Sequence, residues 1–245
     1  MRDASPPVLR EFETWLSLFT DGDLPPEHEW KAWFCVAEYE REDFEAVAAR
    51  LAEAGEAGSF AVLGRDAEAQ ADTIAALDDA GHEIVLHSHR HHAYGDLDYG
   101  EAHDALTTGL AAVEDAAGVR PRGFFAPFLE LSDGAVDAVV DVGFDWVLGT
   151  TDRDVSGVEI TPPVIPFDTR LLVEHEPAEA MGRLREAAEA GDGPFLFHPP
   201  VVEYFEGTAA FEDWIDAVSP TTVAEALGGD RSGVVLDCVR PVRVE

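Results

Sequence analysis

The sequence has very few basic residues. Its 245 residues include 16 lysines and arginines against 50 aspartates and glutamates, and Lys31 is the only lysine, which gives a formal net charge of −34. Binding to nucleic acid needs a basic face, and the absence of any basic run argues against such a partner. The excess of carboxylates predicts strong repulsion within the folded chain, which concentrated salt screens. The composition therefore predicts a halophilic protein.

Long apolar runs are also missing. Residues Met1–Pro7 lack the apolar stretch of a secretion signal, and no segment reaches the about 20 apolar residues of a membrane span. These features predict a cytoplasmic protein. The only two cysteines, Cys35 and Cys238, lie near opposite ends of the chain and are more often core residues than a disulfide or a metal pair. A Gly-x-Ser-x-Gly elbow and glycine-rich phosphate fingerprints are absent, which disfavours serine hydrolases and nucleotide-binding proteins.

Hydrophobic residues nevertheless make up 46% of the chain and recur in periodic blocks, which excludes a disordered acidic chain. Apolar strands alternate with amphipathic helices, so the class is α/β with parallel strands. The predicted strands are 32–36, 59–63, 83–87, 123–126, 144–148, 171–174, 194–198 and 234–239, and the predicted helices are 7–20, 42–54, 67–80 and 99–117. The number of units favours a barrel or incomplete barrel, as one domain of residues 1–245 whose residues 1–30 form a helical extension.

Histidines follow two of the predicted strands. His87 ends one strand and His91 comes four residues later, whereas His198 ends another strand far along the chain. Active residues gather where parallel strands end, so these three side chains should share one mouth. Histidines four apart are more often surface or core residues, but the strand end favours a pair that binds Zn²⁺ or a similar ion. An imidazole beside such an ion, as expected of His198, is a suitable general acid for a leaving amine.

One segment of the chain carries a specific motif. Residues 81–91 read Gly-His-Glu-Ile-Val-Leu-His-Ser-His-Arg-His. This segment resembles the metal-binding motif of the polysaccharide deacetylases of the NodB homology type, carbohydrate esterase family 4. The segments 58–64, 123–128, 143–146 and 196–198 resemble, in the same order, the family's other strand motifs. The likeness covers roughly residues 31–198 and implies a divergent member of haloarchaeal type.

The resemblance implies a distorted (β/α)7 barrel that hydrolyses a non-peptide amide bond at Zn²⁺ or another divalent metal. It gives His87 and His91 the ligand positions and His198 the position of the catalytic acid. The implied substrate-binding residues are Pro127, Trp146 and Leu196, the last lining the pocket for the acyl group. The expected substrate is an N-acetylated sugar or glycan precursor. The alternatives are a small amide such as a cyclic ureide, or a catalytically silent barrel that binds a glycan or a partner.

The chain departs from the family pattern at two places. The family ends its first strand with Thr-Phe-Asp-Asp, a base followed by a ligand, whereas alignment without gaps puts Ala37 and Glu38 at those positions. Glu38 can still bind the metal through its carboxylate. The arginine that orients the base in the family is replaced by Phe125. Either the standard chemistry is lost, or another carboxylate is the base, for which the candidates, each otherwise a solvated surface residue, are Glu40, Asp152 and Asp154.

The net charge leads to a test of folding against salt concentration. We expect the compact state to require molar KCl, because at 1 M salt the Debye length falls to about 3 Å and the carboxylates are screened from one another. Circular dichroism during dialysis into dilute buffer should show loss of helical signal. An unchanged spectrum in dilute buffer would contradict the halophilic interpretation.

Overall fold

The computed structural model describes residues 38–40, 44–238 and 240–242. The predicted helix 7–20, the predicted strand 32–36 and the proposed extension of residues 1–30 lie outside these residues. Within the described part, no helix is long and apolar enough to cross a membrane.

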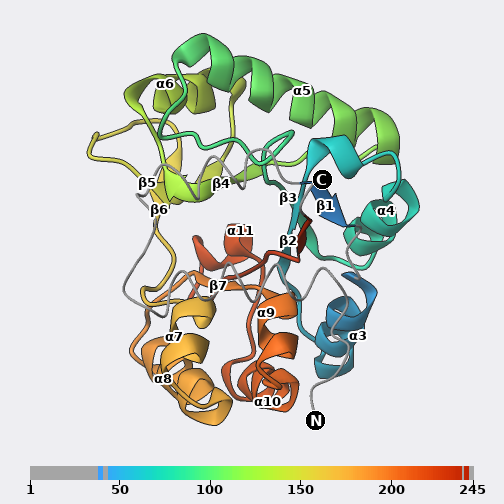
Figure 1. Ribbon diagram of the computed structural model, residues 1–245, viewed down its shortest axis with the longest axis vertical. Helices are drawn as coiled ribbons and strands as arrows, with labels where there is room; N and C mark the ends of the chain where they lie inside the picture. The colour runs from blue at the N-terminus through green and yellow to red at the C-terminus, as the bar shows by residue number, and fades with distance from the viewer. Residues whose placement is uncertain (1–37, 41–43, 239, 243–245) are drawn as a thin grey trace.

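Seven parallel strands form the centre of the structure, and the sheet curls into a half-barrel (Figure 1). In spatial order they are β6 (Glu159–Thr161), β5 (Trp146–Thr150), β4 (Gly123–Glu130), β3 (Glu83–Leu86), β2 (Ser59–Val62), β8 (Val234–Leu236) and β7 (Phe195–Phe197). Every neighbouring pair is parallel. The protein is a distorted (β/α)7 barrel, as expected from the resemblance.

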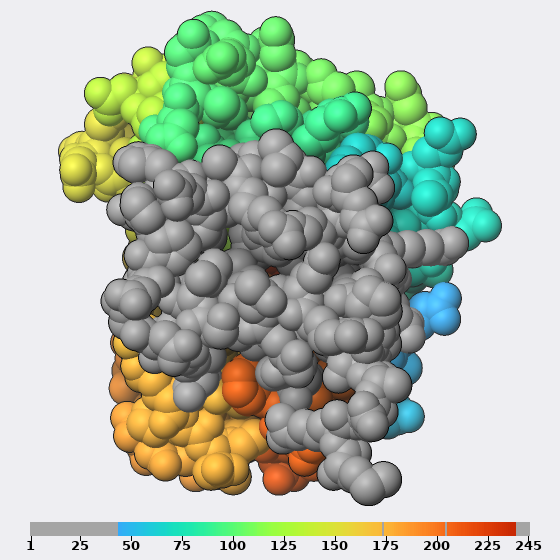
Figure 2. Space-filling view, viewed as in Figure 1, coloured from blue at the N-terminus to red at the C-terminus, as the bar shows by residue number. Residues whose placement is uncertain are grey.

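Helices cover the outside of this sheet. They are α3 (Phe44–Ala54), α4 (Ala71–Asp79), α5 (Tyr99–Ala117), α6 (Asp133–Val142), α7 (Asp168–Glu174), α8 (Pro177–Glu189), α9 (Pro199–Tyr204) and α10 (Thr208–Val218), with a 3₁₀ turn at Gly64–Asp66. The short helix α11 (Val223–Ala226) instead lies on the inner side, where its backbone N–H groups donate to Ser59 and Glu83 at the start of β2 and β3. In Figure 2, α5 and α6 form the upper rim of the visible face, and α7 to α10 form the lower rim. Helices on the outside leave the C-terminal strand ends as the place for a site.

Local sequence explains the boundaries of α5, which match the predicted helix 99–117. Asp98 accepts a hydrogen bond from the backbone N–H of Glu101, and the Glu101 side chain accepts one from the N–H of Asp98 in return. Gly118 ends the helix with a φ of 71°, a conformation that glycine adopts without a steric penalty. A capping box and a glycine C-cap therefore fix both ends.

Both faces of the strands are buried, which explains their continuous apolar runs. Phe60, Ile84 and Phe124 point to the outside and pack in the large cluster beneath the helices. The alternate strand residues Ala61, Val85, Phe125, Trp146, Leu148, Leu196 and Val235 point into the barrel, where they form a second cluster together with Val223 of α11. Because successive residues of a strand point to opposite faces, residues two positions beyond Val85, Leu196 and Val235 also point inward. Those residues are His87, His198 and Asp237.

The structure corrects one predicted strand. Leu171–Glu174 was expected to be extended but forms the second half of α7, whose Leu171 and Leu172 are buried against the barrel. Short apolar runs of this kind do not distinguish a buried strand from a buried helix. The strand that follows β5 in the sheet is instead β6, a partly exposed edge strand that pairs with β5.

The C-terminal part of the chain enters the sheet between two earlier strands. Strand β8 lies between β2 and β7 rather than at an edge. After it, β9 (Arg240–Val242) pairs in antiparallel fashion with β1 (Glu38–Glu40) in a separate two-stranded sheet. The residue that follows β8 is therefore brought between residues that follow β3 and β7.

Candidate metal and acid–base site

His87 follows directly after β3 and is fully buried. Its Nδ1 lies 2.9 Å from the backbone oxygen of Phe125. A carbonyl oxygen only accepts, so Nδ1 carries the hydrogen, and in the neutral ring Nε2 carries a lone pair. Burial lowers the pKa of His87 and outweighs the opposing effect of Asp237, which keeps the ring neutral at neutral pH. The Nε2 atom is thus available as a ligand.

A turn brings His91 against His87. The backbone of Ser88 and His91 is left-handed, with φ values of 70° and 57°, and such conformations cost about 1–3 kcal/mol each. The N–H of Gly64 donates to the oxygen of Ser88 at 3.0 Å and anchors the turn to the neighbouring strand. The two imidazole centroids lie 4.6 Å apart, with an interplanar angle of 78°. Burial and the neighbouring His87 lower the pKa of His91 well below its ordinary value, so this ring is neutral as well.

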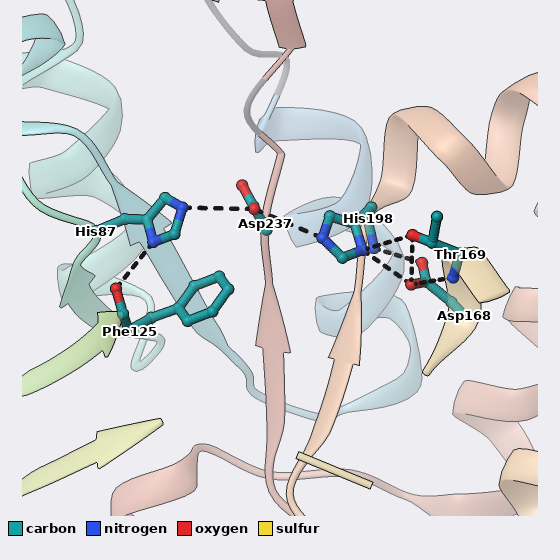
Figure 3. Close-up of polar contacts among 6 residues, drawn as sticks. All are labelled: His87, Phe125, Asp168, Thr169, His198 and Asp237. Carbon is teal, nitrogen blue, oxygen red and sulfur yellow. Dashed lines mark hydrogen bonds and ion pairs between the residues drawn. The ribbon is translucent and has the colours of Figure 1, made fainter. Parts of the chain in front are cut away.

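Asp237 lies between His87 and His198 (Figure 3). Its Oδ2 is 3.6 Å from Nε2 of His87 and 3.6 Å from Nε2 of His198. The backbone N–H of Asp237 donates to the oxygen of Phe197 at 2.9 Å, which ties it to β7. Ligand atoms of His87, His91 and Asp237 all lie within 4.8 Å of one another, and all three residues are buried. These residues form a potential three-ligand metal site.

His198 is held by a buried carboxylate on its other side (Figure 3). Asp168, the first residue of α7, accepts hydrogen bonds from the backbone N–H of His198 at 2.5 Å and from its Nδ1 at 2.8 Å. Thr169 also donates its backbone N–H to the same carboxylate at 2.6 Å. Burial opposes protonation of His198, but Asp168 and then Asp237 outweigh it and raise the pKa above its ordinary value. The arrangement suits a histidine that carries and releases a proton.

The carboxylates predicted from the sequence, Glu38, Glu40 and Asp152, lie on two separate segments of the structure. Backbone pairing sets Glu38 opposite Val242 and Glu40 opposite Arg240, on the ribbon that follows Asp237. Asp152 is exposed in the loop after β5 and the described contacts do not connect it with the histidines. The described structure therefore brings together His87, His91 and His198 with a different carboxylate, Asp237.

The predicted substrate-binding residues are also separated. Leu196 is buried two residues before His198, and Pro127 is buried in the second half of β4. Trp146 is the first residue of β5, and its indole N–H donates at 2.8 Å to Glu83, the first residue of β3. This contact joins the N-terminal ends of parallel strands, so the structure does not bring Trp146 to the histidines.

Two site residues were not predicted. Asp237 directly follows the apolar run Val234–Leu236, just as His198 follows Phe195–Phe197, and this strand-end position was the available signal. The family pattern drew attention to the first strand instead. Asp168 carried no comparable signal, because it begins a helix in a segment that was expected to be a loop followed by a strand.

A curled barrel of parallel strands with polar side chains at its C-terminal strand ends defines the class of (β/α)7 barrels with a site at that mouth. The polysaccharide deacetylase family model matches residues 25–147, half of the chain, and the chain belongs to this family. No curated protein matches the chain in sequence.

Solved structures share the fold. The Puue allantoinase is 17% identical with a TM-score of 0.58, over 79% of this chain and 68% of that chain. A family 4 carbohydrate esterase from Streptomyces lividans, in complex with acetate, is 15% identical with a TM-score of 0.52, over 70% of this chain and 80% of the esterase chain. A CE4 family pseudoenzyme from Bacillus anthracis is 17% identical with a TM-score of 0.50, over 78% of this chain and 57% of the pseudoenzyme chain. At these identities the likeness supports the fold alone.

The contact between Asp168 and His198 leads to a pH prediction. A raised pKa means that protonated His198 stabilises the fold below the ordinary value of 6.5, and that this contribution is lost as the pH rises through the folded value. Asp168→Asn removes the negative charge, so the NMR titration midpoint of His198 should fall. The variant should also lose about 1.5–3 kcal/mol of stability, as expected for a hydrogen bond to a charged group. An unchanged midpoint, equal to that of the exposed control Asp192→Asn, would refute this role of Asp168.

Proposed function

We propose that this protein is a metal-dependent hydrolase that removes the acetyl group from an N-acetylated sugar or glycan precursor. We assign His87, His91 and Asp237 as the metal ligands and His198 as the catalytic acid. Membership of the polysaccharide deacetylase family supports hydrolysis of the carbohydrate deacetylase type. The observation that carries the metal assignment is the contact between His87 and Asp237.

In that contact two electron-rich atoms face each other. Nε2 of His87 is buried and has no hydrogen-bond partner among the described residues, and the nearest carboxylate oxygen, of Asp237, is 3.6 Å away. With the hydrogen on Nδ1, a lone pair of His87 points at a lone pair of Asp237, which is repulsive unless a cation lies between them. Two ligands about 2.1 Å from a tetrahedral ion lie about 3.4 Å apart, close to the observed distance. Two neutral imidazoles and a carboxylate are a donor set suited to Zn²⁺.

A divalent ion bound there would polarise the amide carbonyl and lower the pKa of a water molecule. His198 faces the same point through Nε2, and its side chain is 20% exposed, so it can be reached by a substrate. Its proton, favoured by Asp168 and Asp237, can pass to the departing amine nitrogen. Asp168 keeps the imidazole oriented while that proton moves.

The base and the fourth ligand belong to the proposal as well. Glu38 and Glu40 stay candidates, Glu38 for the metal and Glu40 for the base, because their strand pairs with β9, which begins three residues after Asp237. Asp152 stays a candidate base on the loop after β5. Pro127 and Leu196 are proposed to contact the substrate, since both lie on strands that end at this mouth.

A catalytically silent barrel is the second candidate. Phe125 replaces the arginine expected from the family, and its ring fills the space beside His87. The pseudoenzyme from Bacillus anthracis has the same fold. This candidate predicts that the protein binds a glycan without hydrolysing it. A small-amide hydrolase remains the third, supported by the fold likeness to an allantoinase.

Metal content tests the assignment of the ligands. Protein purified without chelators should hold about one Zn²⁺ or similar ion per chain. His87→Ala, His91→Ala and Asp237→Asn should each lose most of it, because each removes one of three ligands. His103→Ala, on α5, should retain the ion, and Glu38→Gln reports whether Glu38 contributes. Elemental analysis of the purified variants decides, and a metal-free parent protein that cannot be loaded would exclude the metal site.

Hydrolysis tests the reaction itself. The metal-loaded protein should release acetate from a chitooligosaccharide, and a positioned acid such as His198 contributes about 10²–10⁴-fold to the rate. His198→Gln should therefore lower kcat by this order and leave metal content unchanged. Binding of the oligosaccharide without acetate release would favour the silent barrel, and release of product only from a cyclic ureide would favour the small-amide hydrolase.

A further inference from the structure

Phe125 makes two separate contacts with the same histidine. Its backbone oxygen lies 2.9 Å from Nδ1 of His87, and its side chain stacks on the His87 ring, with centroids 4.1 Å apart and an interplanar angle of 21°. Phe125 is 3% exposed and belongs to the interior cluster with Val85 and Leu196. Figure 3 shows the Phe125 ring beneath His87, on the side of the barrel interior.

We propose that Phe125 is a positioning residue for the metal: its ring fixes the plane of the His87 imidazole, and its backbone oxygen fixes the tautomer. This inference rests on the proposed metal site. The backbone contact determines which nitrogen carries the hydrogen, and the stacked ring determines where the other nitrogen points. Both together direct Nε2 toward Asp237.

The backbone around Phe125 supports this role. Strand β4 pairs regularly with β5 up to Phe125 and Leu148, and then its register shifts before the pair of Glu130 with Thr150. Phe128 and Leu129, within the shifted segment, have φ values of 62° and 67°. The Phe128 ring lies edge-on against His91 at 5.0 Å. Phe125 is thus the last residue of β4 that pairs with β5 before the register shifts, and it contacts His87 from the regular part of the ladder.

The same geometry bears on the arginine that the family pattern places at position 125. Here the side chain at this position is surrounded by apolar residues and lies against a proposed metal ligand. A buried guanidinium there would need a carboxylate partner, and the carboxylate that faces His87 is Asp237, a proposed ligand. Phe125→Arg should therefore weaken metal binding instead of improving the site.

Matched variants separate positioning from packing. Phe124 is the neighbouring residue on β4, is 0% exposed, and packs outward against Tyr94 and Phe144. Phe125→Leu and Phe124→Leu each remove one buried ring, and only the first removes the stacking on His87. Contacts that orient a metal-binding histidine are typically worth 10- to 100-fold in metal affinity. We expect Phe125→Leu to weaken Zn²⁺ binding by about 10-fold and Phe125→Arg by about 100-fold, with Phe124→Leu within twofold of the parent.

Three measurements decide the inference. Competition with a chelating dye gives the Zn²⁺ affinity, and the visible spectrum of the Co²⁺-substituted protein reports the ligand geometry, which should change in Phe125→Leu and not in Phe124→Leu. In the metal-free protein, the NMR shift of the His87 ring proton reports the stacking directly and should move only in Phe125→Leu. Should Phe125→Leu fail to fold, Phe125→Met, which is also unbranched at its Cβ and lacks a ring, is expected to give the same changes.

Each outcome has a separate meaning. If Phe125→Leu and Phe124→Leu show the same affinity, the same Co²⁺ spectrum and the same His87 shift, Phe125 is only a core residue and the inference is wrong, while the metal site stands. If the parent protein binds no metal, the proposed function fails, and a His87 shift unchanged by Phe125→Leu would then overturn the positioning role as well.

Discussion

The site depends on one strand being inserted between two others. Strand β8 lies between β2 and β7, and β3 lies just beyond β2. Asp237 at the end of β8 thereby faces His198, after β7, on one side and His87, after β3, on the other, at 3.6 Å each. Parallel pairing of β8 with β2 and with β7 holds this position. The backbone N–H of Asp237 also donates a hydrogen bond to the backbone oxygen of Phe197. In the proposed metal site, a carboxylate at the end of the last parallel strand joins the two histidines, whereas the family pattern assigns the carboxylate ligand to the first strand.

Burying so many ionisable groups together requires that each be compensated. His87 and His91 are neutral because burial lowers their pKa. The Nδ1–H of His87 donates a hydrogen bond to the backbone oxygen of Phe125. His198 instead favours its charged form, since carboxylates face both of its nitrogens. In the proposed mechanism, two neutral rings and one protonatable ring around a single carboxylate would separate the binding of a cation from the transfer of a proton.

The apolar interior of the barrel makes this separation possible. Phe125 packs beneath His87, Leu196 lies two residues before His198, and Val235 lies two residues before Asp237. At the other end of the strands, Glu83 accepts hydrogen bonds from Ser59 and Trp146, and burial raises its pKa. Between these two polar ends the buried side chains of the second cluster fill the interior, so electrostatic effects at the site are little screened from below.

The sequence by itself determined much of the architecture. Alternating apolar strands and amphipathic helices predicted the parallel α/β barrel, because only crossovers can join parallel strands, and the capping residues of α5 fixed that helix to the residue. Strand-end positions were enough to single out His87, His91 and His198. The short apolar run at Leu171 was assigned to a strand and is helical, since local pattern does not separate buried strands from buried helices.

Only the tertiary structure decided which carboxylates join the histidines. Asp237 and Asp168 are 150 and 30 residues away from the histidines they contact, His87 and His198 respectively. Their roles depend on the order of strands in the sheet and on the start of α7, neither of which has a local signature. In a chain with 50 acidic residues, residue type carries little information about function. Asp237 joins the histidines because parallel strands end at one mouth and because the order of strands in the sheet differs from their order in the sequence. Asp168 joins them because α7 begins beside the end of β7.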